Sequence, residues 1–146
     1  MVWFPMTKHL PLLLALTAGW PAHAEWLTLG GSAGDAGNSY VQVDPTSVVV
    51  DGTKRLMAVR LSLAAPRVTR DGIKFRSFSG QASIDCEARS ARYVGATYFA
   101  QPNFVGEPIA VKVFEPDDVR PMNFDGAPGD LATRTVNAAC GVTGTR

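Results

Sequence analysis

The sequence predicts an α+β domain in which a β-sheet is followed by a single C-terminal helix. Apolar and polar residues alternate in short runs between residues 26 and 113, a pattern typical of strands. Only residues 130–141 have helical spacing. One cysteine, Cys86, ends an alternating run and the other, Cys140, ends the helical stretch, so a disulfide between them would join the helix to the sheet.

Residues 1–24 have the features of a secretory signal peptide. Lys8 and His9 precede a short apolar run, and Ala22-His23-Ala24 provides small residues at a cleavage site. Because the apolar run is too short to cross a bilayer core of about 30 Å, we expect cleavage and no membrane span afterwards. No cysteine follows the site to accept lipid. Residues 25–146 are therefore expected to form one exported domain, either periplasmic or secreted to the cell surface.

Residues 25–63 predict short strands joined by turns. The strand at 25–29 is followed by a glycine-rich loop over 30–38, which lacks the Lys-Ser/Thr ending of a phosphate-binding loop and is interpreted as a connection. Strands at 39–43 and 48–50 flank a turn at 44–47. In the run from 54 to 63, alternation places four apolar side chains on one face. These are Met57, Val59, Leu61 and Leu63.

Residues 64–113 predict a turn-rich link over 64–72 and three further strands. In the run that ends at Cys86, the apolar positions change from odd, at Phe75, to even, at Phe78. This change of phase predicts a bulge or bend near residues 77–80, which Gly80 would ease. A strand follows at 90–101. The inner face of the last strand is expected to consist of Ile109, Val111 and Val113.

Residues 130–141 predict the helix. Asp130 suits the N-cap, and Gly141 suits a left-handed C-terminal position. The small residues of its apolar stripe allow a close approach to the sheet. They are Ala132, Val136, Ala139 and Cys140. In an exported chain two cysteines usually form a structural disulfide, and closing this 54-residue loop contributes about 4 kcal/mol in the chain-entropy model.

The expected mature chain has no histidine and no net charge. His9 and His23 lie in the predicted signal peptide, and removal of Lys8 leaves 13 basic and 13 acidic side chains. The chain therefore lacks Ser-His-Asp and Cys-His catalytic systems and the usual zinc ligands. Zero net charge gives no overall attraction to nucleic acid. We expect a binding protein with no cofactor, no metal and no nucleic-acid partner, rather than an enzyme. A hydrolase that uses only carboxylates is a weaker hypothesis.

Three sequence features resemble a known family. They are the run Tyr40-Val41-Gln42-Val43-Asp44-Pro45-Thr46-Ser47, the pair Arg76-Ser77 ahead of Cys86, and a helix that ends at Cys140. In this order the chain resembles the surface-adhesin protein E family of exported bacterial proteins. The resemblance implies one antiparallel sheet of about six strands, with a C-terminal helix held on it by the disulfide. It also implies non-enzymatic binding of host matrix or plasma proteins; the alternative is a periplasmic accessory or structural protein with a partner inside the envelope.

Basic residues flank the run that ends at Cys86. They are Arg67, Arg70, Lys74, Arg76, Arg89 and Arg92. If the two flanks pair as neighbouring strands, they form a patch for a sulfated glycan, an acidic protein or a phosphate-bearing polymer. The alternative, which we favour, is a solvated face balanced by nearby acidic residues. The partner's identity and the oligomeric state are not predicted, although an unpaired edge strand would allow a dimer.

Strand aromatics and a cluster of acidic residues are two further candidate binding sites. Strand aromatics more often belong to a core than to a recognition surface, and this applies to Tyr93, Tyr98, Phe99 and Phe104. Acidic side chains after the last strand do not have the spacing of a calcium loop, and we interpret them as solvated. They are Glu115, Asp117, Asp118 and Asp125.

Overall fold

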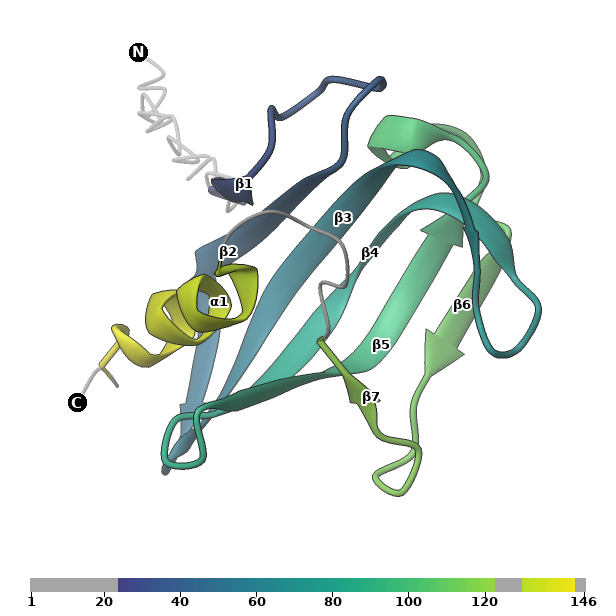
Figure 1. Ribbon diagram of the computed structural model, residues 1–146. Coiled ribbons are helices and arrows are strands. Elements are labelled where there is room, and N and C mark those ends of the chain that lie inside the picture. The colour runs from purple at the N-terminus through teal and green to yellow at the C-terminus, as the bar shows by residue number, and fades with distance from the viewer. Residues whose placement is uncertain (1–23, 123–129, 144–146) are drawn as a thin grey trace, which may run out of the picture.

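The computed structural model describes residues 24–122 and 130–143, and the predicted signal peptide lies outside the described residues apart from Ala24. Within these ranges it contains seven strands and one α-helix (Figure 1). The elements are β1 (Leu27–Gly30), β2 (Tyr40–Asp51), β3 (Lys54–Val68), β4 (Lys74–Asp85), β5 (Ser90–Phe99), the 3₁₀ helix η1 (Pro102–Phe104), β6 (Ala110–Val113), β7 (Arg120–Pro121) and α1 (Leu131–Cys140).

All strands pair antiparallel in one sheet, in the order β1-β2-β3-β4-β5-β6. The two-residue strand β7 also pairs with β5, at Arg92 and Tyr93, next to the stretch that pairs with β6. Helix α1 packs on one face, which we call the inner face, and contacts β1 to β5. The predicted fold class, a single antiparallel sheet with a C-terminal helix, is confirmed.

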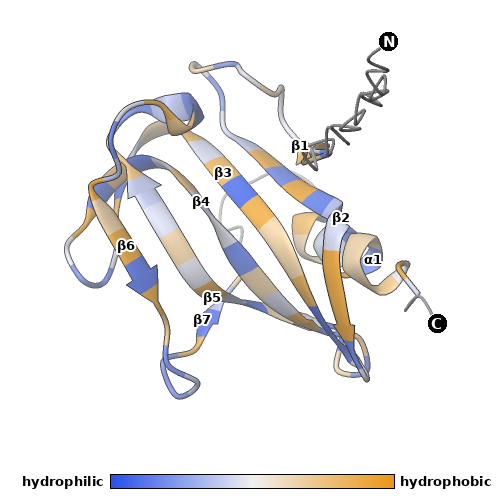
Figure 2. Ribbon diagram, turned by 180° about the vertical axis from the view of Figure 1, so that it is seen from behind, coloured by the Kyte–Doolittle hydropathy of each residue, from blue (hydrophilic) through white to orange (hydrophobic). Residues whose placement is uncertain are grey.

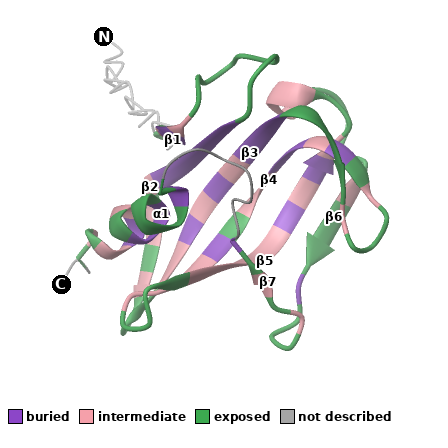
Figure 3. Cartoon of the chain, viewed as in Figure 1, coloured by how far each residue is buried: buried purple, intermediate pink, exposed green. Residues whose placement is uncertain are grey.

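The core lies between the inner face and α1. Met57, Val59, Leu61 and Leu63 are all buried, as their alternation predicts. Figure 3 shows buried residues alternating with less buried ones along β3, β4 and β5. Since one face of these strands is covered and the other is largely open, the pattern of period two follows directly from the packing.

The change of phase predicted in β4 is present, but the expected bulge at residues 77–80 is wrong, because the pairing of β4 with β3 is regular from Ser77 to Asp85. The rings of Phe75 and Phe78 lie 6.0 Å apart on the inner face although they are three residues apart in the chain. The pairing of β3 with β4 breaks between Ser62 and Arg67, and the extra residues lie in β3 rather than in β4. The role expected for Gly80 is wrong. A Cβ there would lie 2.1 Å from the carbonyl oxygen of Gly95, so this glycine permits a close approach to β5.

Residues 44–47 form an irregular stretch within β2, not a turn between two strands. The pairing with β3 shifts between Asp44 and Val49. Side-chain oxygens accept hydrogen bonds from main-chain amides there. The Asp44 carboxylate accepts from the Thr46 amide at 2.9 Å, and the Ser47 hydroxyl accepts from the Ala58 amide of β3 at 2.8 Å. The predicted link at 64–72 is also shorter than expected, because β3 continues to Val68.

The expectation that Ile109, Val111 and Val113 form an inner face is wrong. Val111 and Val113 are 68% and 81% exposed, and Ile109 is also exposed. The reason is that β6 is an edge strand, and its two valines lie opposite Thr97 and Gly95 on the face away from α1. Figure 2, viewed from this second, outer face, shows hydrophilic residues interspersed with hydrophobic ones along β3 and β4.

Helix α1 begins as predicted, with the Asp130 side chain accepting from the Thr133 amide at 3.4 Å. The left-handed conformation expected of Gly141 is wrong, since its φ is −72°. The buried stripe also differs, because Ala132 is exposed. The helix residues that are buried are Leu131, Thr135, Val136 and Ala139.

The predicted disulfide is present. Cys86, directly after β4, bonds to Cys140 at the end of α1, with the two Cα atoms 5.7 Å apart. It holds the C-terminal end of the helix at the end of the sheet where β4 turns into β5, and the rest of the inner face lies away from this attachment (Figure 1).

Candidate functional site

A cleft of about 500 Å³ opens on the inner face, and no residue of α1 lines it. Its lining comes from the β3–β4 hairpin, from β5, and from the segment between β6 and β7. The residues that form its floor and walls are Leu61, Val68, Thr69, Phe75, Phe78, Tyr93, Ala96, Tyr98, Phe114, Val119 and Pro121, with Arg67, Arg70 and Arg120 among them. A volume of this size lies in the range typical of pockets for small groups, about 300–1,000 Å³.

The floor of the cleft is aromatic. Phe78 and Tyr98 are directly paired across β4 and β5, and their ring centroids are 5.9 Å apart. Phe75 packs against Tyr98 at 4.9 Å, and Tyr93 packs edge-on against Phe78 at 5.1 Å. Because the rings meet edge to face, each is held by its neighbours in a fixed orientation. The small side chain of Ala96, two residues before Tyr98, leaves space above this floor.

Two tyrosines, Tyr93 and Tyr98, belong to the lining. Burial raises the pKa of Tyr93, opposed by the positive charge of Arg67. Burial also raises the pKa of Tyr98, opposed by Arg120. Both phenols are therefore neutral donors at physiological pH. Neither hydroxyl is hydrogen-bonded to another described residue, so both can bond to a ligand in the cleft.

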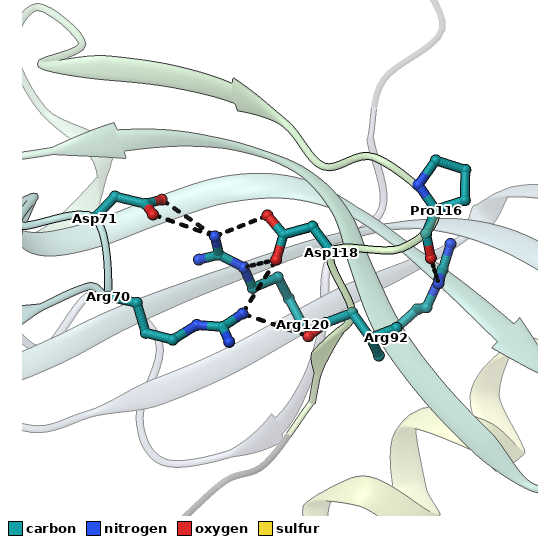
Figure 4. A network of polar contacts seen from close by, with 7 residues as sticks. Arg70, Asp71, Arg92, Pro116, Asp118 and Arg120 are labelled. Atoms are coloured by element: carbon teal, nitrogen blue, oxygen red, sulfur yellow. Dashed lines mark hydrogen bonds and ion pairs between the residues drawn. The ribbon is translucent and has the colours of Figure 1, made fainter.

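The wall of the cleft is fixed by an ion-pair network around Arg120 (Figure 4). Arg120 donates to the two carboxylate oxygens of Asp118 at 2.7 and 2.9 Å, and to Asp71 at 3.2 and 3.3 Å. Arg70 also donates to Asp118, at 3.2 Å. The Arg120 guanidinium lies 4.6 Å from the centroid of Phe114. The network thereby joins the β3–β4 turn to the chain around β7.

This network shifts the pKa values of its members. The pKa of Asp118 is lowered, chiefly by the hydrogen bond from Arg120, and the same hydrogen bond raises the pKa of Arg120. The Arg120 side chain is only 15% exposed, whereas Asp118 and Asp71 are more than a third exposed. Arg120 is therefore the central charge of the network, and the two carboxylates face outwards to solvent. Asp118, which the sequence analysis interprets as a solvated side chain, is instead paired with Arg120 and Arg70.

The six basic residues singled out in the sequence lie in different places. Arg67 and Arg70 line the cleft. Lys74 neighbours Phe75 in β4 and does not line the cleft, and Arg76 donates to the carbonyl groups of residues 36, 63 and 64. The structure therefore brings only Arg67 and Arg70 together at this site.

The other two basic residues lie along β5 and its preceding turn. Arg89 donates to Asn137 of α1, and Arg92 donates to the carbonyl oxygen of Pro116 at 2.9 Å. Asp85 lies nine positions after Arg76 in β4, which is about 30 Å of extended strand, so Arg89 lies far from the first group. Arg120, which the sequence analysis does not single out, lines the cleft together with Arg67 and Arg70.

The four aromatic residues weighed in the sequence also divide between the two faces. Tyr93 and Tyr98 lie in the cleft. Phe104 lies on the outer face and packs against Phe99 with ring centroids 6.4 Å apart. It also lies 4.6 Å from the guanidinium of Arg60, which is 4.2 Å from the ring of Trp26 on its other side.

The polar groups around Arg60 are occupied within the protein. Arg60 donates to Gln42 at 2.7 Å, and Gln42 donates to Thr28 at 3.0 Å. Burial lowers the pKa of Arg60. The Gln42 side chain and the Nε of Arg60 are therefore engaged within the protein, whereas neither Nη group of Arg60 donates to another described residue.

Two further properties of the described ranges bear on function. In residues 24–122 and 130–143, no three histidine, cysteine or acidic side chains are grouped so that they could hold a metal ion; Asp125 lies outside the described residues. The one α-helix in these ranges is too short and too polar to cross a bilayer.

Comparison with known proteins identifies the family. No curated protein and no solved structure matches the chain significantly. A family model described as "Surface-adhesin protein E" matches residues 26–141, which include every described strand, α1 and both cysteines. The chain therefore belongs to the surface-adhesin protein E family, and membership indicates an adhesin-like protein with a surface or exported location.

Proposed function

We propose that this protein is an exported binding module that holds a protein partner at the cleft on its inner face. The observation that carries the proposal is the combination of an aromatic floor with arginine side chains at one rim. Aromatic and arginine residues dominate the energetics of protein interfaces, because they bury large areas and form directed hydrogen bonds. Residues 1–24 act as the signal for export, and no step of catalysis is required.

A sulfated glycan fits the cleft less well than a protein does. A polyanion is held by several unpaired cations in a row. At this rim Arg120 is already paired with two carboxylates, and those carboxylates would repel a second or third sulfate. The apolar floor would contribute little to holding sulfate groups, whereas it would bury an apolar side chain of a protein.

Binding to immobilised matrix and plasma proteins tests this proposal. The purified protein is expected to bind at least one of them. Arg67→Glu is expected to weaken that binding about tenfold or more, because it reverses an exposed charge at the rim of the cleft. Lys74→Glu makes the same change of charge on the same end of the sheet, beside the cleft but outside its lining, and is expected to bind like the wild type.

Two results would contradict the proposal. One is the absence of binding to any protein tested, with binding to sulfated glycans alone. The other is equal binding by the wild type and Arg67→Glu. Fractionation of expressing cells adds the cellular location: surface accessibility to an antibody agrees with a host partner, and confinement to the periplasm directs the search to a partner protein of the envelope.

A further inference from the structure

We infer that the cleft recognises a single carboxylate adjoining an aromatic or large aliphatic group, as at the end or at an acidic position of a polypeptide segment. This inference rests on the proposed function, and it specifies which part of a partner enters the cleft. The apolar group would lie on the floor formed by Phe75, Phe78 and Tyr98, and the carboxylate would meet the arginine rim.

The charge of the rim indicates one anionic group. Three arginines, Arg67, Arg70 and Arg120, line the cleft, and two carboxylates, Asp71 and Asp118, are paired at the same rim. Three positive and two negative charges leave one positive charge uncompensated. One carboxylate would balance this charge, whereas a group with several negative charges would be repelled by the two acidic residues.

Arg67 is the group best placed to meet the carboxylate. It pairs directly with Phe75 across β3 and β4, so the two side chains project from the same face of the sheet, and its charge acts on Tyr93. Arg67 makes no hydrogen bond or ion pair with another described residue. Arg120 has its Nε and one Nη engaged by carboxylates, and Arg70 shares Asp118 with it. The guanidinium of Arg67 can therefore donate to a ligand without breaking a bond within the described part of the chain.

The two tyrosines extend the recognition. Tyr93 and Tyr98 are neutral phenols in the lining, and they can donate to a carboxylate or to a main-chain carbonyl of the bound segment. A cleft of about 500 Å³ admits one or two side chains. These properties describe a short anchor of a larger partner, of the kind that provides most of the energy in a protein interface.

A matched pair of fluorescent probes tests the inference. Anilinonaphthalene sulfonate carries one anionic group on an aromatic body, and phenylnaphthylamine has nearly the same body without the charge. The wild-type protein is expected to bind both, with the anionic probe bound more tightly. Arg67→Gln is expected to weaken binding of the anionic probe about tenfold while leaving the neutral probe unchanged. Lys74→Gln removes an equal charge outside the cleft and is expected to change neither affinity.

Each outcome has a separate meaning. Equal affinities of the wild type for the two probes, or an unchanged affinity of Arg67→Gln for the anionic probe, would overturn the inference about the carboxylate and leave the cleft as a binding site. No binding of either probe would remove the cleft itself and the proposed function with it. As a control, the melting temperatures of both variants should be close to that of the wild type, which would show that all three proteins are folded.

Short peptides extend the same test. An acetylated tripeptide that ends in phenylalanine with a free carboxylate is expected to displace the anionic probe, as is one with an internal aspartate beside phenylalanine. The amidated form of the first peptide is expected to displace it at least several-fold more weakly. Displacement by the free end alone would place the chain terminus of a partner in the cleft. Displacement by heparin and by neither peptide would overturn the inference.

Discussion

Arg120 donates to both carboxylate oxygens of Asp71, at 3.2 and 3.3 Å, across 49 residues of chain. Asp71 lies in the turn between β3 and β4, and Arg120 lies in the short strand β7. The contact therefore holds the two walls of the cleft together at the side where α1 is absent. A strand of only two residues gives little pairing of its own, so this ion-pair network is the main attachment of β7 to the hairpin.

Replacement of Arg120 should destabilise the protein more than replacement of Arg70. Arg120→Met keeps an unbranched side chain but removes the guanidinium that lies over Phe114 and pairs with two carboxylates. We expect the melting temperature to fall by several degrees, on the order of 5 °C. Arg70→Met removes one exposed pair and should change it little. Thermal unfolding monitored by circular dichroism measures both, and equal melting temperatures for the two variants would show that the network is not organised around Arg120.

The same network predicts a dependence on pH. The pKa of Asp118 in the folded protein is lower than its usual value of 3.8, so its contribution to stability is present above that value and is lost as the pH falls through the folded pKa. The stability difference between the wild type and Asp118→Asn should therefore be constant from pH 7 to about pH 5 and shrink below about pH 4. Urea unfolding across this range measures the difference. A stability difference that does not change with pH would contradict a lowered pKa of Asp118 in the folded protein.

The disulfide should provide a large part of the stability. The Cys86–Cys140 bond closes a loop of 54 residues, so its loss is expected to lower the free energy of unfolding by about 2–4 kcal/mol. Urea unfolding of the Cys86→Ser, Cys140→Ser double variant measures this loss, and the wild type with reductant provides an independent comparison. An unchanged urea midpoint would mean that packing of α1 alone fixes the helix to the sheet.

Gly80 and Gly95 provide a matched pair of substitutions. A Cβ at Gly80 would lie 2.1 Å from the Gly95 carbonyl oxygen, whereas a Cβ at Gly95 would have its nearest contact at 3.4 Å, with the Lys112 carbonyl oxygen. Gly80→Ala must displace the main chain of β5 and is expected to cost about 2–4 kcal/mol, and Gly95→Ala less than about 1 kcal/mol. Similar urea midpoints for the two variants would contradict the close approach of β4 and β5 at this point.

Much of the fold can be predicted from the sequence because most strands have only one covered face. The covered face of β3 can be predicted from the alternating apolar residues Met57, Val59, Leu61 and Leu63. The start of α1 can be predicted from Asp130, because an N-cap depends on residues close in the sequence. The same logic misleads at β6, where Val111 and Val113 alternate as a buried face would. Periodicity shows that two side chains share a face, but it does not show whether another element covers that face.

The cleft is less predictable because it depends on contacts between distant segments. Arg67 was singled out in the sequence, but its neighbour Arg120 comes from a strand of two residues that no local pattern marks. The sequence groups Arg89 with Arg67 because they flank the run that ends at Cys86, yet β4 places them at opposite ends of the sheet. Which charges meet depends on strand length and register, and these follow from the whole sheet.

The central claim is that ligands bind in the cleft, and chemical-shift mapping tests it most directly. Addition of anilinonaphthalene sulfonate to the isotopically labelled protein should shift the amide resonances of residues such as Tyr93, Ala96 and Tyr98 in a nitrogen–proton NMR spectrum. The resonances of Gln42 and Arg60, whose side chains lie on the outer face, should change little. Shifts that cluster around Gln42 and Arg60 and leave the Tyr93–Tyr98 stretch unchanged would contradict the account.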